Sequence, residues 1–87
     1  GPDKRCEAFG WLIERPGPEY LSARELGGYE FFWTRAYARA TRFHSRHQAD
    51  MVMMAVRQLK PDLFPVGIEV KLLNMGDNAK IMSDIVC

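Results

Sequence analysis

The chain has 87 residues, of which 47% are hydrophobic and 26% charged, and its formal net charge is +1. This composition indicates one small globular domain and excludes a disordered chain. No stretch approaches the roughly 18 consecutive apolar residues that a membrane span requires, so we expect no membrane contact. The near-neutral charge is also atypical of a dedicated nucleic-acid-binding protein.

Residues 1–7 are expected to be a tag remnant, Gly1-Pro2, followed by a frayed, charged N-terminus. The two cysteines, Cys6 and Cys87, lie near the two ends and match no metal or redox spacing. Two cysteines and no apolar signal segment favour a reducing, cytoplasmic location. A disulfide between them remains an alternative if the two ends meet.

The first predicted strand covers residues 8–14, an apolar run bounded by Arg15-Pro16-Gly17-Pro18. Its alternation places three side chains on one face: Phe9, Trp11 and Ile13. Gly10, on the other face, indicates a bulge or a close neighbour.

Two more strands are predicted over residues 19–23 and 29–33, separated by a loop that ends in Gly27-Gly28. The nearly continuous apolar content of 29–33 predicts a central strand. The three strands would form an antiparallel meander. Thr34 is then expected to cap a short helical turn over residues 35–39.

The main helix is predicted to follow Ser45, with Gln48 completing a capping box and Lys60-Pro61 ending it. Phe43 is placed to pack across the cap as a hydrophobic staple. Apolar residues at spacings of three and four predict the buried stripe: Ala49, Val52, Met53, Val56 and Leu59. In the loop behind Pro61, Leu63 and Phe64 are the candidates for burial.

A fourth strand is predicted over residues 66–73, with the alternate residues inward: Val66, Ile68, Val70 and Leu72. Asp77 is expected to cap a final short helix over 78–86 whose apolar face holds Ile81, Met82 and Ile85. The predicted fold is α+β, a small antiparallel sheet of three to four strands with one main helix packed across one face (β-β-β-α-β) and short helices. Residues 8–75 would form the single domain, and 76–87 a C-terminal short helix or tail.

Four arginines fall in a stretch without acidic residues, 31–49, which also contains two histidines and interleaved aromatic residues. The arginines are Arg35, Arg39, Arg42 and Arg46. Their spacing would let one helical face present the first three. With Trp33 and Tyr37 they could contact the phosphates and bases of nucleic acid, meet an acidic protein surface, or form a solvated face paired with nearby carboxylates. The carboxylates available for such pairing are Glu14, Glu30 and Asp50.

Other motifs carry less chemistry. His44 and His47 have no third ligand nearby and straddle a helix cap, which favours two exposed histidines over a metal site. Met51 and Met54 flank the buried stripe, so either the C-terminal segment covers them, the favoured alternative, or they form an apolar interface. No nucleotide-binding, hydrolase or metalloprotease signature is present, and acidic residues are scattered singly. We therefore predict no catalytic residues, no cofactor and no metal.

The sequence resembles a group of small uncharacterised proteins encoded by phages and prophages of bacteria. The matching segments are W-L-I-E at 11–14, Y-L at 20–21, G-G-Y-E-F-F-W-T at 27–34, Ala40 with R-F at 42–43, Ser45, A-D at 49–50 and I-E-V at 68–70. The resemblance stops near Asn74. The chain departs from the group at the arginine after W-T, Arg35, where the group usually carries an acidic residue.

This resemblance implies a non-enzymatic phage- or prophage-derived protein that docks on a bacterial host protein and inhibits or redirects it, as an anti-CRISPR-like inhibitor would. The expected contacts are Arg35, Arg39, Arg42 and Arg46, with Trp33 or Tyr37 as the aromatic anchor. One alternative is a nucleic-acid-binding module that uses the same arginines. Another is a structural homodimer formed through a sheet edge or through Met51 and Met54.

Overall fold

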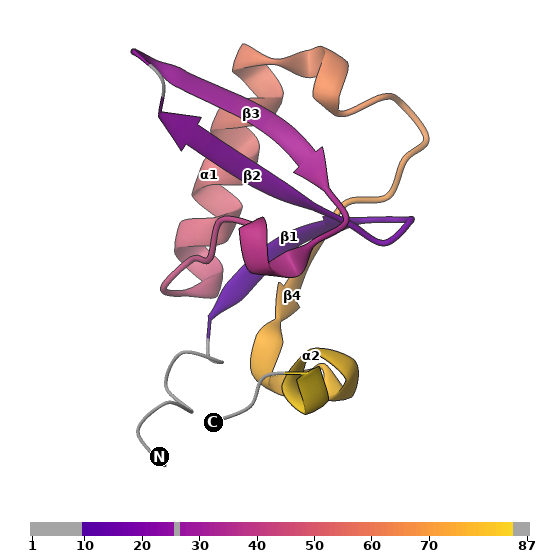
Figure 1. Ribbon diagram of the computed structural model, residues 1–87. Helices are drawn as coiled ribbons and strands as arrows, with labels where there is room; N and C mark the ends of the chain where they lie inside the picture. Colours follow the sequence, from indigo (N-terminus) through magenta and orange to yellow (C-terminus); the bar gives the residue numbers. More distant parts are fainter. Residues whose placement is uncertain (1–9, 26, 85–87) are drawn as a thin grey trace.

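The computed structural model describes residues 10–25 and 27–84 and confirms the α+β fold (Figure 1). Four antiparallel strands form one sheet in the order β3-β2-β1-β4. The strands are β1 (Trp11–Arg15), β2 (Glu19–Glu25), β3 (Tyr29–Thr34) and β4 (Lys71–Asn74). The helices are α1 (Arg46–Leu59), α2 (Ala79–Asp84) and three 3₁₀ turns, η2 (Tyr37–Arg39), η3 (Pro61–Leu63) and η4 (Met75–Asp77). The predictions for Phe9, Ile85, Cys6 and Cys87 lie outside the described residues.

The meander of the first three strands is confirmed, but β3 lies at the edge of the sheet and the prediction of a central strand is wrong. Its continuous apolar run has a different cause. Phe31 and Trp33 pack against the core beneath α1. Phe32 points to the opposite face, where the guanidinium carbon of Arg24 lies 5.1 Å from the ring centroid. A cation over the ring thus shelters an aromatic residue that no further strand covers.

The first two strands pair only next to their connecting turn, at Glu14 with Tyr20 and Arg15 with Glu19. Beyond that point they diverge, and residues 39–43 fill the space between them. The amides of Trp11 and Phe43 each donate to the other residue's carbonyl, at 2.9 and 2.8 Å. The amide of Thr41 donates to the Leu21 carbonyl at 3.1 Å, and the Thr41 hydroxyl accepts from the Ala23 amide at 2.8 Å. The arginine-bearing stretch is therefore held to both strands.

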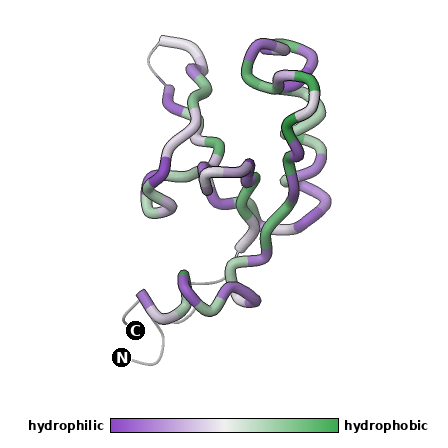
Figure 2. The backbone as a smooth tube through the Cα atoms, turned by 90° about the vertical axis from the view of Figure 1, so that its right-hand side faces the viewer, coloured by the Kyte–Doolittle hydropathy of each residue, from purple (hydrophilic) through white to green (hydrophobic). Residues whose placement is uncertain are grey.

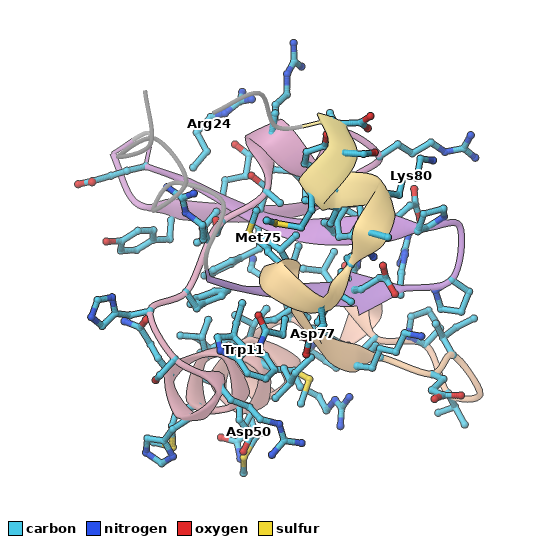
Figure 3. All side chains as sticks on the ribbon, turned by 90° about the horizontal axis from the view of Figure 1, so that it is seen from below. Trp11, Arg24, Asp50, Met75, Asp77 and Lys80 are labelled. Carbon is cyan, nitrogen blue, oxygen red and sulfur yellow. The ribbon has the colours of Figure 1, made fainter. Side chains whose placement is uncertain are left out.

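Each face of the sheet has its own core. On the α1 side, Ile13, Leu21, Phe43, Ala49, Val56 and Phe64 are buried together. On the opposite side, Leu12, Tyr20, Met75 and Ile81 form a second cluster beneath η2 and α2. Leu12 and Ile13 are neighbours in β1 and point to opposite faces, as strand geometry requires. Figure 3 shows the two helices from below, with Asp50 on α1 and Lys80 on α2.

The predicted cap and stripe of α1 are largely confirmed. The Ser45 hydroxyl accepts from the Gln48 amide at 3.1 Å, and the Gln48 side chain accepts from the His44 amide at 2.7 Å, in place of the Ser45 amide of a regular capping box. Ala49 and Val56 are buried, but Leu59 is 70% exposed, so its predicted burial is wrong. Phe64 follows η3 and fills the core beside Trp33, with the ring centroids 5.6 Å apart.

Loss of this cap should destabilise the fold measurably. Ser45→Ala removes the acceptor for the Gln48 amide and is expected to lower the free energy of unfolding by about 1 kcal/mol. Urea unfolding followed by circular dichroism measures this change. Ser83→Ala is the matched control, because that hydroxyl donates to a carbonyl within α2 at an exposed position. Equal losses in the two variants would mean that the cap contributes nothing specific.

The fourth strand is shorter than predicted. Val70 and Leu72 pack on the α1-side core as predicted, but Val66 is fully exposed and Ile68 is 44% exposed, so their inward placement is wrong. The reason lies in β1, the pairing partner of β4. Lys71 pairs with Glu14, and β1 ends one residue later, at Arg15. Residues 66–69 therefore lie beyond the end of β1 and have no partner along it.

The C-terminal helix is built into the second core. The side-chain oxygen of Asn78 accepts from the Ile81 amide at 2.9 Å, so Asn78 caps α2 and the prediction of Asp77 as the cap is wrong. Ile81 is 1% exposed and Met82 is half-buried. The predicted turn after β3 is also shorter than expected: Thr34 accepts from the Ala36 amide at 3.2 Å, and only η2 is helical.

Candidate functional site

The four arginines are all exposed, but they do not share a helical face. Arg35 follows β3, Arg39 ends η2, Arg42 lies between η2 and α1, and Arg46 begins α1. The predicted common face for Arg35, Arg39 and Arg42 is wrong, because η2 has three residues and the backbone after it is bonded to β1 and β2. The arginines instead lie on separate segments, from the residue after β3 to the first residue of α1.

No ion pair joins these arginines to a carboxylate within residues 10–25 and 27–84. The two ion pairs in that part of the chain are Arg15 with Glu19 at 2.8 Å and Lys71 with Glu14 at 3.7 Å. Glu14, one of the carboxylates expected to neutralise the arginines, therefore pairs with Lys71 instead. The arginine-bearing stretch keeps its positive charge available to a partner.

The two predicted aromatic anchors lie on opposite faces of the sheet. Trp33 is half-buried on the α1 side, where its indole N–H donates to the Leu63 carbonyl at 2.9 Å and the Arg15 guanidinium lies 4.6 Å from its ring centroid. Tyr37 is half-buried on the opposite side and meets Tyr20 edge to face, with centroids 6.4 Å apart. One docking surface cannot use both rings, and Tyr37 is the one that shares a pocket with one of the four predicted arginines, Arg35.

Arg35 and Tyr37 line a pocket of about 450 Å³ between the β1–β2 turn, η2 and α2. The other side chains that contribute charge or hydroxyl groups to it are Tyr20, Glu14, Lys80 and Asp84. Lys80 comes from α2 and was not predicted as a site residue. Its arrival beside Arg35 depends on the packing of Ile81 against Leu12 and Tyr20.

The electrostatics of this pocket leave its two cations available. Arg35 and Lys80 have no ion-pair partner in the described part of the chain, whereas Glu14 is 12% exposed and pairs with Lys71. Burial raises the pKa of Tyr37, and the adjacent Asp84 carboxylate raises it further by accepting a hydrogen bond and by its charge. Burial also raises the pKa of Tyr20, with a further contribution from Glu14. Both phenols thus stay protonated at neutral pH, and their single O–H groups donate to Asp84 and Glu14 within the pocket.

Two apolar features lie away from this pocket. Met51 and Met54 are 56% and 53% exposed, so their favoured burial beneath the C-terminal segment is wrong: α2 packs on the opposite face of the sheet. An apolar cavity of about 310 Å³ lies between the β2–β3 hairpin and α1, which stand apart in Figure 2. Tyr29, Phe31, Phe43 and Val52 are among its lining residues. The sequence did not reveal this cavity, because it depends on the angle between hairpin and helix.

Neither the family models, the curated proteins nor the solved structures with which the chain was compared gave a match. Within the described ranges, no helix combines the length and apolar character needed to cross a membrane. His44 and His47 are exposed, and residues 10–25 and 27–84 hold no group of three or more side chains suited to a metal ion. The chemistry that the pocket offers is the recognition of an acidic group by Arg35 and Lys80.

Proposed function

We propose that this protein is a small non-enzymatic binding protein that docks on an acidic surface of another protein. The observation that carries the proposal is the pocket in which Arg35 and Lys80 meet without an ion-pair partner among the described residues. An aspartate or glutamate side chain of the partner that enters this pocket would accept charge-assisted hydrogen bonds, the strongest kind that proteins form. Tyr37 supplies an aromatic wall at the same place.

The remaining arginines extend this positive surface beyond the pocket. Arg39, Arg42 and Arg46 are exposed and lie on the segment from η2 to the first residue of α1. Exposed charges at the rim of an interface contribute little affinity each, but they steer a charged partner and raise its association rate. We therefore assign the pocket most of the affinity, and the outer arginines mainly the rate of encounter.

The partner in this proposal is a bacterial host protein in the cytoplasm, which the protein inhibits or redirects, as an anti-CRISPR-like or other anti-defence factor does. The resemblance to small phage and prophage proteins supports this role. The chain differs from that group at Arg35, and Arg35 lines the pocket. Because Arg35 replaces the acidic residue that the group usually carries, it would give this chain a preference for an acidic partner.

Reversing the charge of the pocket should abolish capture of the partner without unfolding the protein. In a pull-down from bacterial lysate, Arg35→Glu and Lys80→Glu are each expected to weaken retention of the partner about tenfold or more, because the entering carboxylate would then meet a like charge. Lys60→Glu is the matched control: it reverses another exposed cation, at the C-terminal end of α1. Thermal unfolding of all three variants separates binding from stability.

The same experiment distinguishes a protein partner from nucleic acid. Retention that survives nuclease and is lost in Arg35→Glu supports the proposal. Retention that disappears with nuclease would replace it with nucleic-acid binding, for which affinity should fall by about one log unit per decade of salt for each phosphate neutralised. Equal retention by Arg35→Glu, Lys80→Glu and Lys60→Glu would exclude the pocket as the docking site.

A further inference from the structure

We infer that the outer edge of β3 pairs with β3 of a second copy, so that two sheets join across a two-fold axis into one continuous antiparallel sheet. This inference goes beyond the proposed function and uses a different part of the molecule. The pocket that holds Arg35 and Lys80 lies toward α2, whereas the outer edge of β3 is the side of that strand away from β2.

The hydrogen bonds of β2 reveal which groups of β3 point outward. The Leu21 carbonyl and the Ala23 amide both bond to Thr41, on the side of β2 away from β3. Because successive residues of a strand direct their backbone groups to alternate sides, Ser22 is the residue that bonds to β3. Leu21 pairs with Trp33 and Ala23 with Phe31, so these partners direct their own N–H and C=O groups away from β2.

The outward set therefore comprises Tyr29, Phe31 and Trp33. No backbone hydrogen bond from these residues to a group outside β2 exists within the described part of the chain. The strand, YEFFWT, also lacks proline, lysine and any bulge, the usual means by which proteins block an exposed edge. Tyr29 is 69% exposed and stacks on Phe31, with ring centroids 6.2 Å apart. An aromatic, unblocked edge of this kind is a template for another strand.

A two-fold axis that passes beside Phe31 and relates the two copies gives hydrogen-bond partners to all the outward backbone groups of β3. Phe31 then lies opposite Phe31 of the second copy, and Tyr29 lies opposite Trp33 of the second copy. Every outward N–H and C=O of these residues gains a partner in this register, and the aromatic cross-strand pairs lie on the α1 side. A shift of the axis by one residue toward the N-terminus would set Glu30 against Glu30 of the second copy, which like-charge repulsion disfavours.

Charge complementarity selects a second copy as the occupant of the edge. In the register centred on Phe31, Glu30 of the second copy lies opposite Phe32. The Arg24 guanidinium already lies over that ring, 5.1 Å from its centroid. Within one chain Arg24 already lies opposite Glu30 in the β2–β3 ladder. Across the two-fold axis, Glu30 of the second copy approaches the same guanidinium from the other side of Phe32, and the axis repeats the pair. Each chain carries both the positive and the negative partner, Arg24 and Glu30, as an interface between identical surfaces requires.

A charge swap tests the pairing. Sedimentation and light scattering over micromolar to millimolar concentration should give a mass of twice the 10.0 kDa chain. Arg24→Glu and Glu30→Lys should each raise the dissociation constant about tenfold or more, and mixing the two single variants should restore it, because opposite charges then face each other between the chains while the like charges that each variant places opposite each other within its own chain remain. Circular dichroism confirms that each variant folds. Met51→Glu with Met54→Glu is the control and should leave the dimer unchanged.

A mass of 10.0 kDa at every concentration would overturn the inference, even if another protein occupied the edge. The inference would also be wrong if Arg24→Glu and Glu30→Lys left the dissociation constant unchanged while Met51→Glu with Met54→Glu dissociated the dimer. That result would place the interface on α1. Arg35→Glu should lose the protein partner and keep the dimer. Failure of the dimer and failure of the proposed function are therefore distinguishable.

Amide hydrogen exchange gives a second readout at single residues. In dilute monomer the outward amides of Tyr29, Phe31 and Trp33 should exchange fast, whereas the Phe32 amide, bonded to β2, exchanges slowly. At concentrations where the dimer forms, the Phe31 amide should become protected and this alternation should vanish. Exchange at Phe31 that does not change with concentration would exclude strand pairing at this edge.

Discussion

Replacing Ile13 by alanine is expected to lower the free energy of unfolding by about 2–5 kcal/mol, a large part of the stability of a domain this small. Ile13 is completely buried. It pairs with Leu72 on β4 and packs in the cluster that joins the sheet to α1. The cost combines the loss of apolar burial with the cavity that the shorter side chain leaves, since strands and helix cannot both close over it.

Thermal unfolding measures this loss, with the melting temperature falling by about 4–8 °C for each kcal/mol in a domain of this size. Ile68→Ala is the matched control, because the same atoms are removed at a residue that is 44% exposed. We expect a change of about 0.5 kcal/mol or less there. An equal loss in both variants would contradict the shortened β4 and support the longer fourth strand that the alternation of 66–73 predicts.

That alternation shows where sequence reasoning about the fold succeeded and where it failed. A helix carries its own signals, and the Ser45 cap, the stripe at Ala49 and Val56 and the stop at Pro61 all lie where expected. A strand needs a partner, and the partner is set by the rest of the fold. Ile68 has the right pattern but lies beyond the end of β1, and β3 has the composition of a central strand but lies at the edge.

The candidate site shows the same division. Arg35 and Tyr37 were identified because they are close in sequence, and they line one pocket. Lys80 and Tyr20 were missed because only the packing of α2 on the second core brings them there. Trp33 and Tyr37 were both candidate aromatic anchors, but they lie on β3 and η2, which two residues separate, and the two rings point to opposite faces of the sheet. Spacing in sequence predicted the charge of the surface, not its geometry.

Gly10→Ala is expected to lower the free energy of unfolding more than Gly28→Ala, because two effects add at Gly10. The φ angle of Gly10 is +149°, a conformation that costs other residues about 1–3 kcal/mol. A Cβ at Gly10 would also lie 2.4 Å from Cγ of Arg42 and 3.2 Å from the Phe43 carbonyl oxygen. That carbonyl accepts from the Trp11 amide, so the added methyl group would disturb the bridge that holds residues 39–43.

Gly28→Ala separates the two effects. Gly28 has a φ of +155°, but a Cβ there meets nothing within 4 Å, so it reports the backbone strain alone. Gly10→Ala should exceed it by the cost of overpacking, about 1–3 kcal/mol, in urea unfolding. The second change Arg42→Ala should recover part of that excess, because it removes the Cγ that the new methyl group overlaps. If Arg42→Ala does not restore stability, the overpacking lies at the Phe43 carbonyl. If Gly10→Ala and Gly28→Ala lower the free energy of unfolding equally, the Arg42 side chain moves away from the new methyl group at no measurable cost.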